Sequence, residues 1–324
     1  MHGMANHVRT ALAWSARRGA VLLAVGIFGG VLFPPLAAAF KAVITPTVVL
    51  LMVLVLLRVD LVRTLAHVRR PARALSIVAA LALASPLVCW LVLWPLPVDP
   101  SIAAAIVIFA TGPAATSSPA FARMVGLDAD LSLVATLAMV VIVPFTAPLI
   151  ALELLGIDLS LSTGEFMLRL LLVVGLPAVL ALGVRRAAGR ARLAEWGEAV
   201  DGAVVWLVVL YGFAVMDGLS LRVAQDPAWV TQAIAAAFVA NYGLNALTTL
   251  AFARWGVPEA AAAGLMGGNR NMALYLAVLP ASTDPRIILF FGLCQFPLFL
   301  SPFLLRPAYR LLLGGRQADG RSSK

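Results

Sequence analysis

The feature that most constrains this chain is a series of apolar windows of about 20 residues, the length that an α-helix needs to cross a bilayer. Their approximate limits are 18–38, 42–62, 73–96, 101–125, 129–153, 165–185, 200–221, 229–253, 258–281 and 286–311. Of the 324 residues, 62% are hydrophobic and only 12% are charged. Soluble domains are roughly 45–50% apolar and about 25% charged. The sequence therefore predicts an all-α polytopic membrane protein with about ten transmembrane helices.

The formal net charge of +9 could indicate nucleic-acid binding, but the basic residues lie in short gaps between apolar windows and form no basic face. Alternate gaps are rich in arginine, and the other gaps hold only Lys41, Arg169, Arg222 and Arg286. Because positive loops stay cytoplasmic, both termini are predicted to be cytoplasmic, in an inner (cytoplasmic) membrane. The first window could instead be a signal peptide that is cleaved after Ala37–Ala39, but it is long for one.

Two windows in corresponding positions of the chain are interrupted. The fourth reads ATGPAATSSPAFA and holds Gly112, Pro113 and Pro119; the ninth reads GLMGGNRNMALYLAVLP and holds Gly267 and Gly268. Five windows is an odd number, so a second copy would enter the membrane from the opposite side. Discontinuous helices at matching places in two halves are typical of an inverted repeat with a binding site at the membrane midplane. The predicted divisions are an N-terminal tail at 1–16, repeats at 17–155 and 156–313, and a C-terminal tail at 314–324.

Polar side chains gather at these two interruptions. Thr116, Ser117 and Ser118 lie at the first, and Asn269, Arg270 and Asn271 lie at the second. An arginine at the centre of a membrane helix costs roughly 2.5–3.5 kcal/mol on insertion scales, so we expect Arg270 to face water or an anion, with a purely structural buried pair as the alternative. Snorkelling to the membrane surface works poorly from this depth. Since no acidic residue lies at the same depth, the natural counter-charge is a substrate anion, a carboxylate, sulfonate or phosphate bound bidentately.

The remaining chemistry-bearing residues exclude other classes of function. The histidines, His2, His7 and His67, lie outside the windows, and Cys89 and Cys294 lack metal-ligand spacing. We therefore expect no metal, no cofactor, no catalytic residues, no enzymatic activity and no nucleic-acid partner.

The segment PAATSSPAFARMVGLDADLSLVAT at Pro113–Thr136, together with GGNRN and ten windows, resembles the bile acid:sodium symporter family, in particular bacterial homologues of the intestinal bile acid transporter. The resemblance implies an inverted five-plus-five repeat with crossing broken helices in windows four and nine. It implies a panel domain from windows 1, 2, 6 and 7 and a core domain from windows 3–5 and 8–10. It also implies that Thr116 and Asn271 line a site for an organic anion.

The chain departs from this family at the sodium ligands. The family's glutamate in window nine is Met266 here, a glutamine is Arg270, an asparagine is Pro119, and a glutamine in window three is Leu81. Ser118, Ser132 and Thr136 remain as possible remnants of the ion site. A hard cation prefers several oxygens, usually with a carboxylate. We therefore predict that sodium coupling is lost and that the Arg270 guanidinium supplies the positive charge.

The favoured function is a secondary transporter of an organic anion by alternating access. A sodium-coupled symporter of the same family remains open, as does a membrane-embedded anion sensor or assembly subunit that does not transport. An arsenite-efflux relative would be expected to carry a cysteine at the first interruption, where this chain has none, and the auxin-carrier type is a weaker match.

Overall fold

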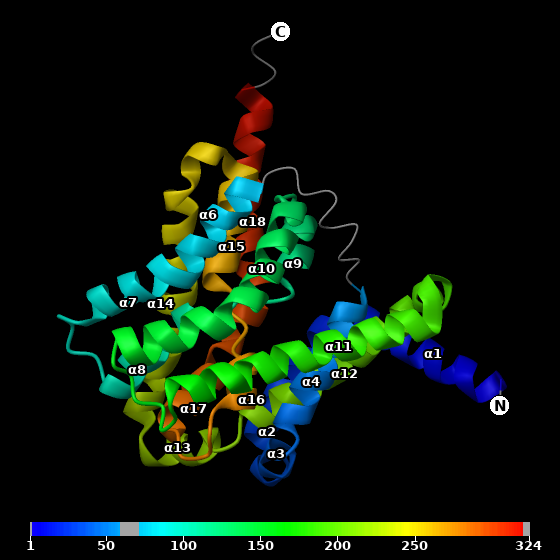
Figure 1. Cartoon of the computed structure of the whole chain (residues 1–324), viewed down its shortest axis with the longest axis horizontal. Coiled ribbons are helices and arrows are strands. Elements are labelled where there is room, and N and C mark those ends of the chain that lie inside the picture. The colour runs from blue at the N-terminus through cyan, green and yellow to red at the C-terminus, as the bar shows by residue number, and fades with distance from the viewer. Residues whose placement is uncertain (1, 59–70, 320–324) are drawn as a thin grey trace.

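The computed structural model describes residues 2–58 and 71–319, and the regular structure there is helical (Figure 1). The first half comprises α1 (His2–Arg17), α2 (Gly19–Leu32), α3 (Pro34–Lys41), α4 (Ile44–Arg58), α6 (Pro71–Ala79), the π-helix η1 (Ala80–Ala84), α7 (Ser85–Leu93), α8 (Pro100–Thr111), α9 (Ser118–Val125), α10 (Ala129–Pro148) and the π-helix η2 (Leu149–Leu154). The second comprises α11 (Thr163–Glu195), α12 (Gly197–Val215), α13 (Leu219–Gln225), α14 (Pro227–Ala251), the 3₁₀ turn η3 (Ala253–Trp255), α15 (Val257–Gly268), α16 (Ala273–Val278), α17 (Pro285–Leu293) and α18 (Gln295–Asp319).

Where the structure describes them, both predicted tails are helical: α1 covers residues 2–16 of the first, and α18 reaches residue 319 of the second. Residues 59–62 of the second window, and the end of the C-terminal tail at 320–324, lie outside the described residues.

Among the described residues, six helical segments are long and apolar enough to cross a membrane. They are Pro71–Leu93, Ala129–Leu154, Thr163–Gly189, Gly197–Gln225, Pro227–Ala251 and Pro285–Leu313. A seventh is the pair α3 and α4 if it counts as one span, although its two helices are bent by 71°. The count of six or seven differs from the expected ten because proline and glycine divide the other windows into shorter helices.

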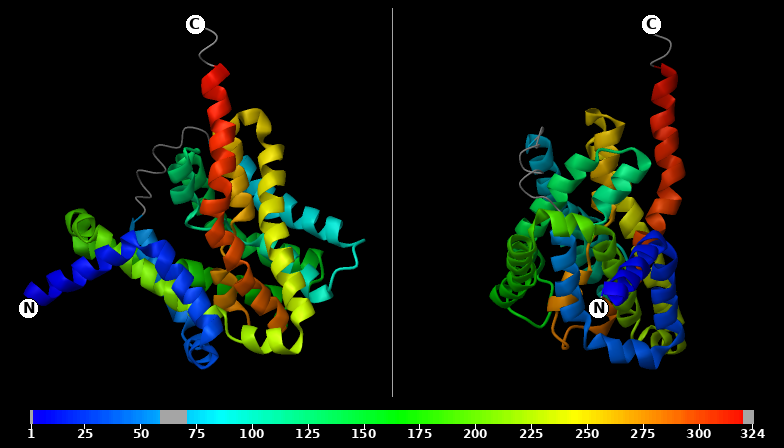
Figure 2. Two further views of the ribbon diagram at one scale, coloured as in Figure 1. Left: turned by 180° about the vertical axis from the view of Figure 1, so that it is seen from behind. Right: turned by 90° about the vertical axis from the view of Figure 1, so that its right-hand side faces the viewer.

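The helices pack in two groups (Figures 1 and 2). The first group consists of the N-terminal helices α1–α4 together with α11 and α12. In it, α12 packs against α1, α2, α3 and α4, and α11 packs against α4. In the other group, α14 packs against α15, α8 against α7 and α17, and α10 against α6, α9 and α15. The short helix α16 contacts both α4 and α11, so it lies where the two groups meet. There the Thr45 hydroxyl donates to the Ala277 carbonyl at 3.0 Å, and Arg169 donates to the Val278 carbonyl at 2.9 Å.

Close packing of α14 against α15 depends on glycine. A Cβ added to Gly264 would lie 1.9 Å from the Thr249 hydroxyl oxygen and 2.6 Å from the Asn245 carbonyl oxygen. A Cβ on Gly268 would lie 2.3 Å from the Asn241 carbonyl oxygen. Small residues at such contacts let membrane helices approach closely, and the van der Waals contacts that form then stabilise the pair.

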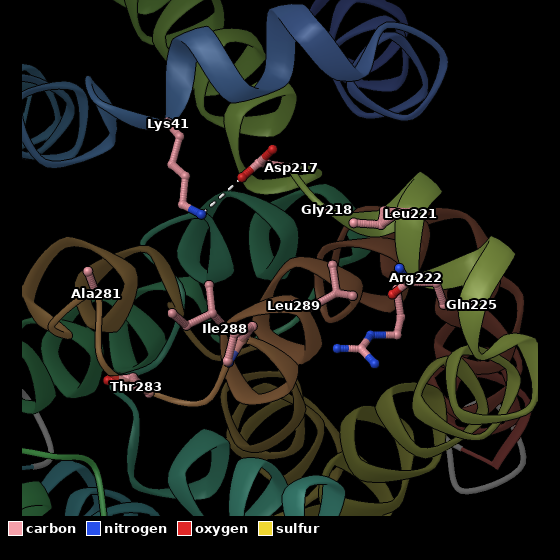
Figure 3. Close-up of a pocket in the computed structure, with 11 residues that line it drawn as sticks. Lys41, Asp217, Gly218, Leu221, Arg222, Gln225, Ala281, Thr283, Ile288 and Leu289 are labelled. Atoms are coloured by element: carbon pink, nitrogen blue, oxygen red, sulfur yellow. Dashed lines mark hydrogen bonds and ion pairs between the residues drawn. The ribbon is translucent and has the colours of Figure 1, made fainter.

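A cavity of about 350 Å³ opens at the ends of α3 and α12, where they face α13 and α17 (Figure 3). Lys41 and Asp217 form an ion pair of 2.9 Å at its edge. The cavity thus lies on the boundary between the two helix groups.

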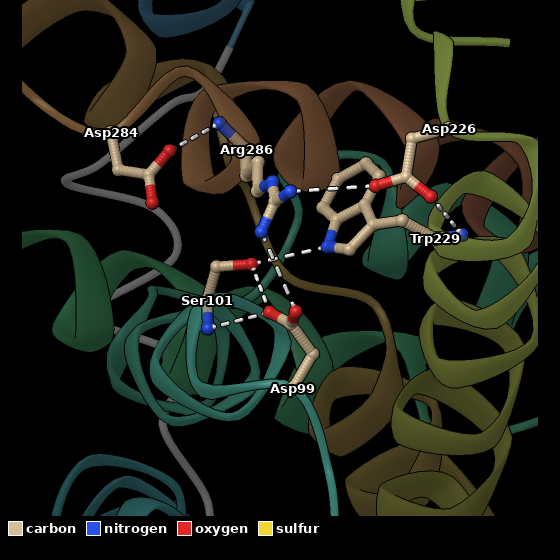
Figure 4. Close-up of polar contacts among 6 residues, drawn as sticks. All are labelled: Asp99, Ser101, Asp226, Trp229, Asp284 and Arg286. Carbon is tan, nitrogen blue, oxygen red and sulfur yellow. Dashed lines mark hydrogen bonds and ion pairs between the residues drawn. The ribbon is translucent and has the colours of Figure 1, made fainter.

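One arginine joins the beginnings of three helices (Figure 4). Asp99, Asp226 and Asp284 cap α8, α14 and α17 by accepting from backbone N–H groups at 2.9, 3.1 and 2.8 Å. The Arg286 guanidinium lies 3.5 Å from the Asp99 carboxylate and 3.4 Å from the Asp226 carboxylate. These N-caps satisfy backbone donors that the helix cannot pair, and the shared cation holds the three ends together.

We expect Gly264→Ala to destabilise the protein by about 1–3 kcal/mol, because the added methyl group overpacks the α14–α15 contact. Gly243 lies on the exposed face of α14, and a Cβ there meets nothing within 4 Å. Gly243→Ala is therefore a matched control, which should leave stability unchanged or raise it by up to about 1 kcal/mol. Unfolding in detergent monitors both variants. Equal stability of the two would contradict the packing described here.

Asp99 makes stability depend on acid. Partial burial raises its pKa, but hydrogen bonds from the Ser101 hydroxyl and from the N–H groups of Ser101 and Ile102, with the charge of Arg286, lower it overall below the usual value. Its stabilising effect is therefore present above the unfolded pKa of about 3.9 and is lost as pH falls through the lower folded pKa.

Asp99→Asn should therefore flatten the acid side of the stability profile, measured as melting temperature between neutral and strongly acidic pH. Asp130→Asn, at an exposed position in the first turn of α10, should leave the profile unchanged. Parallel profiles for the native protein and Asp99→Asn would contradict this assignment.

Candidate functional site

Two broken helices cross at the centre of the second helix group. The chain leaves helix between α8 and α9 and again between α15 and α16, and the two breaks pair as an antiparallel β-bridge between Ala114 and Arg270. The Ala115 N–H donates to the Asn269 carbonyl at 2.8 Å, and the Asn271 N–H donates to the Pro113 carbonyl at 2.8 Å. The breaks thus satisfy part of each other's backbone, as buried non-helical chain in a membrane requires.

The sequence around each break explains where it falls. Proline disfavours helix at the residue before it, and Gly112, which precedes Pro113, has an extended ψ of 154°. Pro119 lies in the first turn of α9, so it starts the second half-helix and does not break the span. Gly267 and Gly268 are likewise the last two residues of α15, and the non-helical segment comes after them. Of the five residues predicted to break the helices, only Gly112 and Pro113 lie in a break.

Arg270 occupies the centre of the crossing, and its guanidinium is bound by protein oxygens. Nε donates to the Gly267 carbonyl at 2.9 Å, and one terminal nitrogen donates to the Gly112 carbonyl at 2.7 Å and to the Leu81 carbonyl at 3.3 Å. The other terminal nitrogen donates to the Ser85 hydroxyl at 3.0 Å. Gly112 and Gly267 lie at the C-termini of α8 and α15, so the cation faces the negative ends of two helix dipoles.

The segment formed by η1 and α7 supplies the other acceptors for Arg270, and one of them is available because of a proline. In the π-helix η1, the Ser85 N–H donates to the Ala80 carbonyl, five residues back. The Leu81 carbonyl would need the N–H of Pro86 as its partner in this pattern, and proline has none. The carbonyl is therefore available to Arg270. Sequence reasoning noted Leu81 only as a lost glutamine and did not find Ser85; the signal was a Ser-Pro pair within an apolar window.

Arg270 is only 1% exposed, which differs from the expectation of a guanidinium that faces water. Its four hydrogen bonds use most of the five N–H donors that arginine carries. A bidentate contact with a substrate would require some of these bonds to break. In this conformation the guanidinium serves as an internal cation for the crossing.

Asn269 also has a role inside the protein. It is fully buried, and its side-chain oxygen accepts from the Ser301 hydroxyl at 3.0 Å and from the Asn241 amide at 3.3 Å. Asn241 donates in addition to the Gly268 carbonyl at 2.8 Å. These contacts tie the end of α15 to α14 and α18.

Three of the predicted site residues differ from this buried pair. Thr116, Ser117 and Asn271 lie in the two breaks and are each partly exposed. Within residues 2–58 and 71–319, their side chains make no hydrogen bond to the protein. They are therefore the polar side chains of the crossing that are available to a ligand.

The possible remnants of the ion site are buried and only weakly paired. Ser118, Ser132 and Thr136 are exposed by 2% or less. The Ser118 and Ser132 hydroxyl oxygens have no hydrogen-bond partner in the described part of the chain, and the Thr136 hydroxyl contacts the Met266 sulfur at 3.6 Å. A thioether and neutral hydroxyls are poor ligands for sodium, which favours oxygens and usually a carboxylate. These residues therefore do not fit a sodium ion.

Comparison with known proteins gives a family match over part of the chain. A sequence model of the Sodium Bile acid symporter family matches residues 45–198. No curated protein matches the chain. The match covers α4 and extends through α11 into α12, so it includes the first break but not the second.

We expect Arg270→Met to destabilise the protein strongly, because each buried acceptor left unpaired costs about 1–3 kcal/mol. Arg270→Lys should be less stable than the native protein but more stable than Arg270→Met. An ammonium group lacks the planar fork of a guanidinium and cannot reach acceptors on three helices at once. Arg254 is exposed in η3, so Arg254→Met is the matched control and should have little effect. Melting temperature in detergent measures all three. If Arg270→Met had the same melting temperature as the native protein, the guanidinium would not be stabilising the crossing.

Proposed function

We propose that this protein is a membrane transporter that moves an organic anion by alternating access without sodium coupling, because the Sodium Bile acid symporter family model matches residues 45–198. The observation that carries the proposal is the binding of the Arg270 guanidinium by oxygens from three helices at the crossing. This arrangement supplies a positive charge where the negative ends of α8 and α15 meet.

A fixed guanidinium and a sodium ion are alternatives at such a place. Both neutralise carbonyl oxygens, but the guanidinium is covalently attached and cannot be carried across the membrane. The nearby Thr136 hydroxyl contacts the sulfur of Met266, a thioether where a carboxylate would be needed. The positive field of Arg270 also opposes a second cation nearby. Transport is then uniport, exchange, or coupling to another ion.

The substrate is an organic anion, a carboxylate, sulfonate or phosphate, and it binds at Thr116, Ser117 and Asn271. The support is that these side chains lie in both breaks, are partly exposed and have hydrogen-bonding capacity to spare. Asn269 and Arg270 act behind them, through the position of the crossing and through charge. A buried charge in a poorly polarisable environment acts over a longer distance than in water.

The proposal extends to the architecture and the orientation. The inverted repeats are 17–155 and 156–313; the panel domain contains α2, α4, α11 and α12, and the core contains the two broken helices. The termini are cytoplasmic, as the arginine-rich gaps favour. Contacts of α16 with α4 and α11 support a boundary between moving parts there.

Sodium independence is tested in two stages. The purified protein is first screened against organic anions by thermal shift, in sodium chloride and in choline chloride, because a ligand of the native state raises its stability. The anion with the largest shift is then tested for uptake into proteoliposomes. We expect equal shifts and equal uptake rates in both salts. A requirement for a sodium gradient would instead establish the coupled symporter, and binding without flux would indicate an anion sensor.

A double variant tests the role of the two substituted positions directly. Met266→Glu with Arg270→Gln places a carboxylate at the position that contacts the Thr136 hydroxyl and a neutral amide at the crossing. We expect binding of the same anion to become sodium-dependent, as measured by thermal shift. Arg254→Gln with Arg306→Gln, which also lowers the net charge by two but at exposed positions, is the control for changed charge alone. Sodium-independent binding by a folded double variant would mean that Arg270 does not replace the ion.

A further inference from the structure

The cavity at the ends of α3, α12 and α17 has the chemistry of a binding site separate from the crossing (Figure 3). Its volume of about 350 Å³ lies within the range of pockets that hold small organic molecules, roughly 300–1,000 Å³. Leu221, Ile288 and Leu289 give it an apolar lining. An occupant therefore needs an apolar body.

The charged groups of the cavity carry an excess of one positive charge. Lys41 and Asp217 pair with each other at 2.9 Å and neutralise each other. Arg222 comes from α13 on another side of the cavity, as Figure 3 shows. Its guanidinium carbon lies 5.8 Å from the centre of the Trp229 ring. In the described residues, the Arg222 side chain makes no hydrogen bond and no ion pair.

The contact with Trp229 prepares Arg222 for an anion. Trp229 is only 3% exposed, and its ring nitrogen donates to the Ser101 hydroxyl at 3.1 Å, so the ring is fixed. A guanidinium near an aromatic ring keeps its in-plane N–H groups free, and these groups match the geometry of a carboxylate or sulfonate. The unpaired charge thus points to an anionic group on the occupant.

We propose that this cavity binds an amphipathic organic anion, with Arg222 on its charged group and Leu221, Ile288 and Leu289 on its apolar part. The inference rests on the proposed function for its role: Lys41 and Arg222 belong to the arginine-poor gaps, so the cavity is an entry site on the non-cytoplasmic side. A basic cavity at the entrance raises the local concentration of an anionic substrate before it reaches the crossing.

The binding test uses the full chain in nanodiscs of zwitterionic lipid, with naphthalene-2-sulfonate as the probe and equilibrium dialysis as the measurement. The uncharged naphthalene-2-sulfonamide controls for apolar partitioning. We expect Arg222→Gln to weaken sulfonate binding about tenfold or more and to leave sulfonamide binding unchanged. Arg254→Gln, at an exposed arginine in η3, should bind the sulfonate as the native chain does.

A second variant keeps the test decisive if Arg222→Gln folds poorly. Ala281 lines the cavity from an exposed turn, so Ala281→Asp adds a repelling charge without disturbing the core. It should also weaken binding of the sulfonate and spare the sulfonamide. Native-like sulfonate affinity in either folded variant, or no saturable binding by the native chain, would overturn the proposal.

Two further arms separate this inference from its alternatives. Nanodiscs that contain an anionic lipid test whether a lipid headgroup is the true ligand; if it abolishes the Arg222-dependent binding, the soluble-anion proposal is overturned. Uptake into proteoliposomes separates the cavity from the transport function. If sulfonate binding depends on Arg222 but no anion is taken up, the cavity proposal is supported and the transport proposal is contradicted. If an anion is taken up with the same KM by the native chain and by Arg222→Gln, and sulfonate binding does not depend on Arg222, transport is supported and the cavity proposal is contradicted.

Discussion

The arrangement of the described helices depends on a problem of charge inside the membrane. Two half-helices, α8 and α15, end near each other in the protein interior, and each end presents carbonyl oxygens that water cannot reach. The Arg270 guanidinium solves this for both, with bonds of 2.7 Å to Gly112 and 2.9 Å to Gly267. The bridge between Ala114 and Arg270 fixes the side chain in place from its own backbone. Charge neutralisation and backbone pairing therefore come from one residue, and the broken helices can cross without an external ion.

The segment formed by η1 and α7 shows that binding the Arg270 guanidinium requires more than an arginine at position 270. A guanidinium has five donors, and the two breaks alone do not supply enough acceptors for them. The π-helix η1 and Pro86 free the Leu81 carbonyl, and the Ser85 hydroxyl adds another acceptor. A buried cation without such partners would be strongly destabilising. The pairing of Ser85-Pro86 with Arg270 thus forms one unit, although the two parts are far apart in the sequence.

The long helices and the first break could be predicted from the sequence, whereas the contacts of Arg270 could not. The length of the apolar windows located the six helical segments that are long enough to cross a membrane, and the Gly112-Pro113 pair located the first break, because both signals act over neighbouring residues. The boundaries were less accurate: Gly267 and Gly268 end α15, and Pro119 begins α9. The burial of Arg270 was not predictable, since a central arginine is compatible with water, an anion or protein carbonyls. Only tertiary contacts with Leu81 and Ser85 distinguish these cases. The Ser118 and Ser132 hydroxyls have no hydrogen-bond partner among the described residues, and this too can be recognised only once their neighbours are known.

The burial of Arg270 changes how an anion would be recognised. With its donors engaged, the guanidinium would attract the proposed anion through its field, and the directional contacts would come from neutral groups at Thr116, Ser117 and Asn271. Field attraction depends weakly on the geometry of the anionic group, whereas a bidentate arginine fork discriminates strongly between planar and tetrahedral groups. A site of this kind distinguishes its substrates mainly by the shape and polarity of the body that fits between the helix groups. Such selection is compatible with carboxylates and sulfonates of similar body alike, and it leaves the charge itself to determine only that the substrate is an anion.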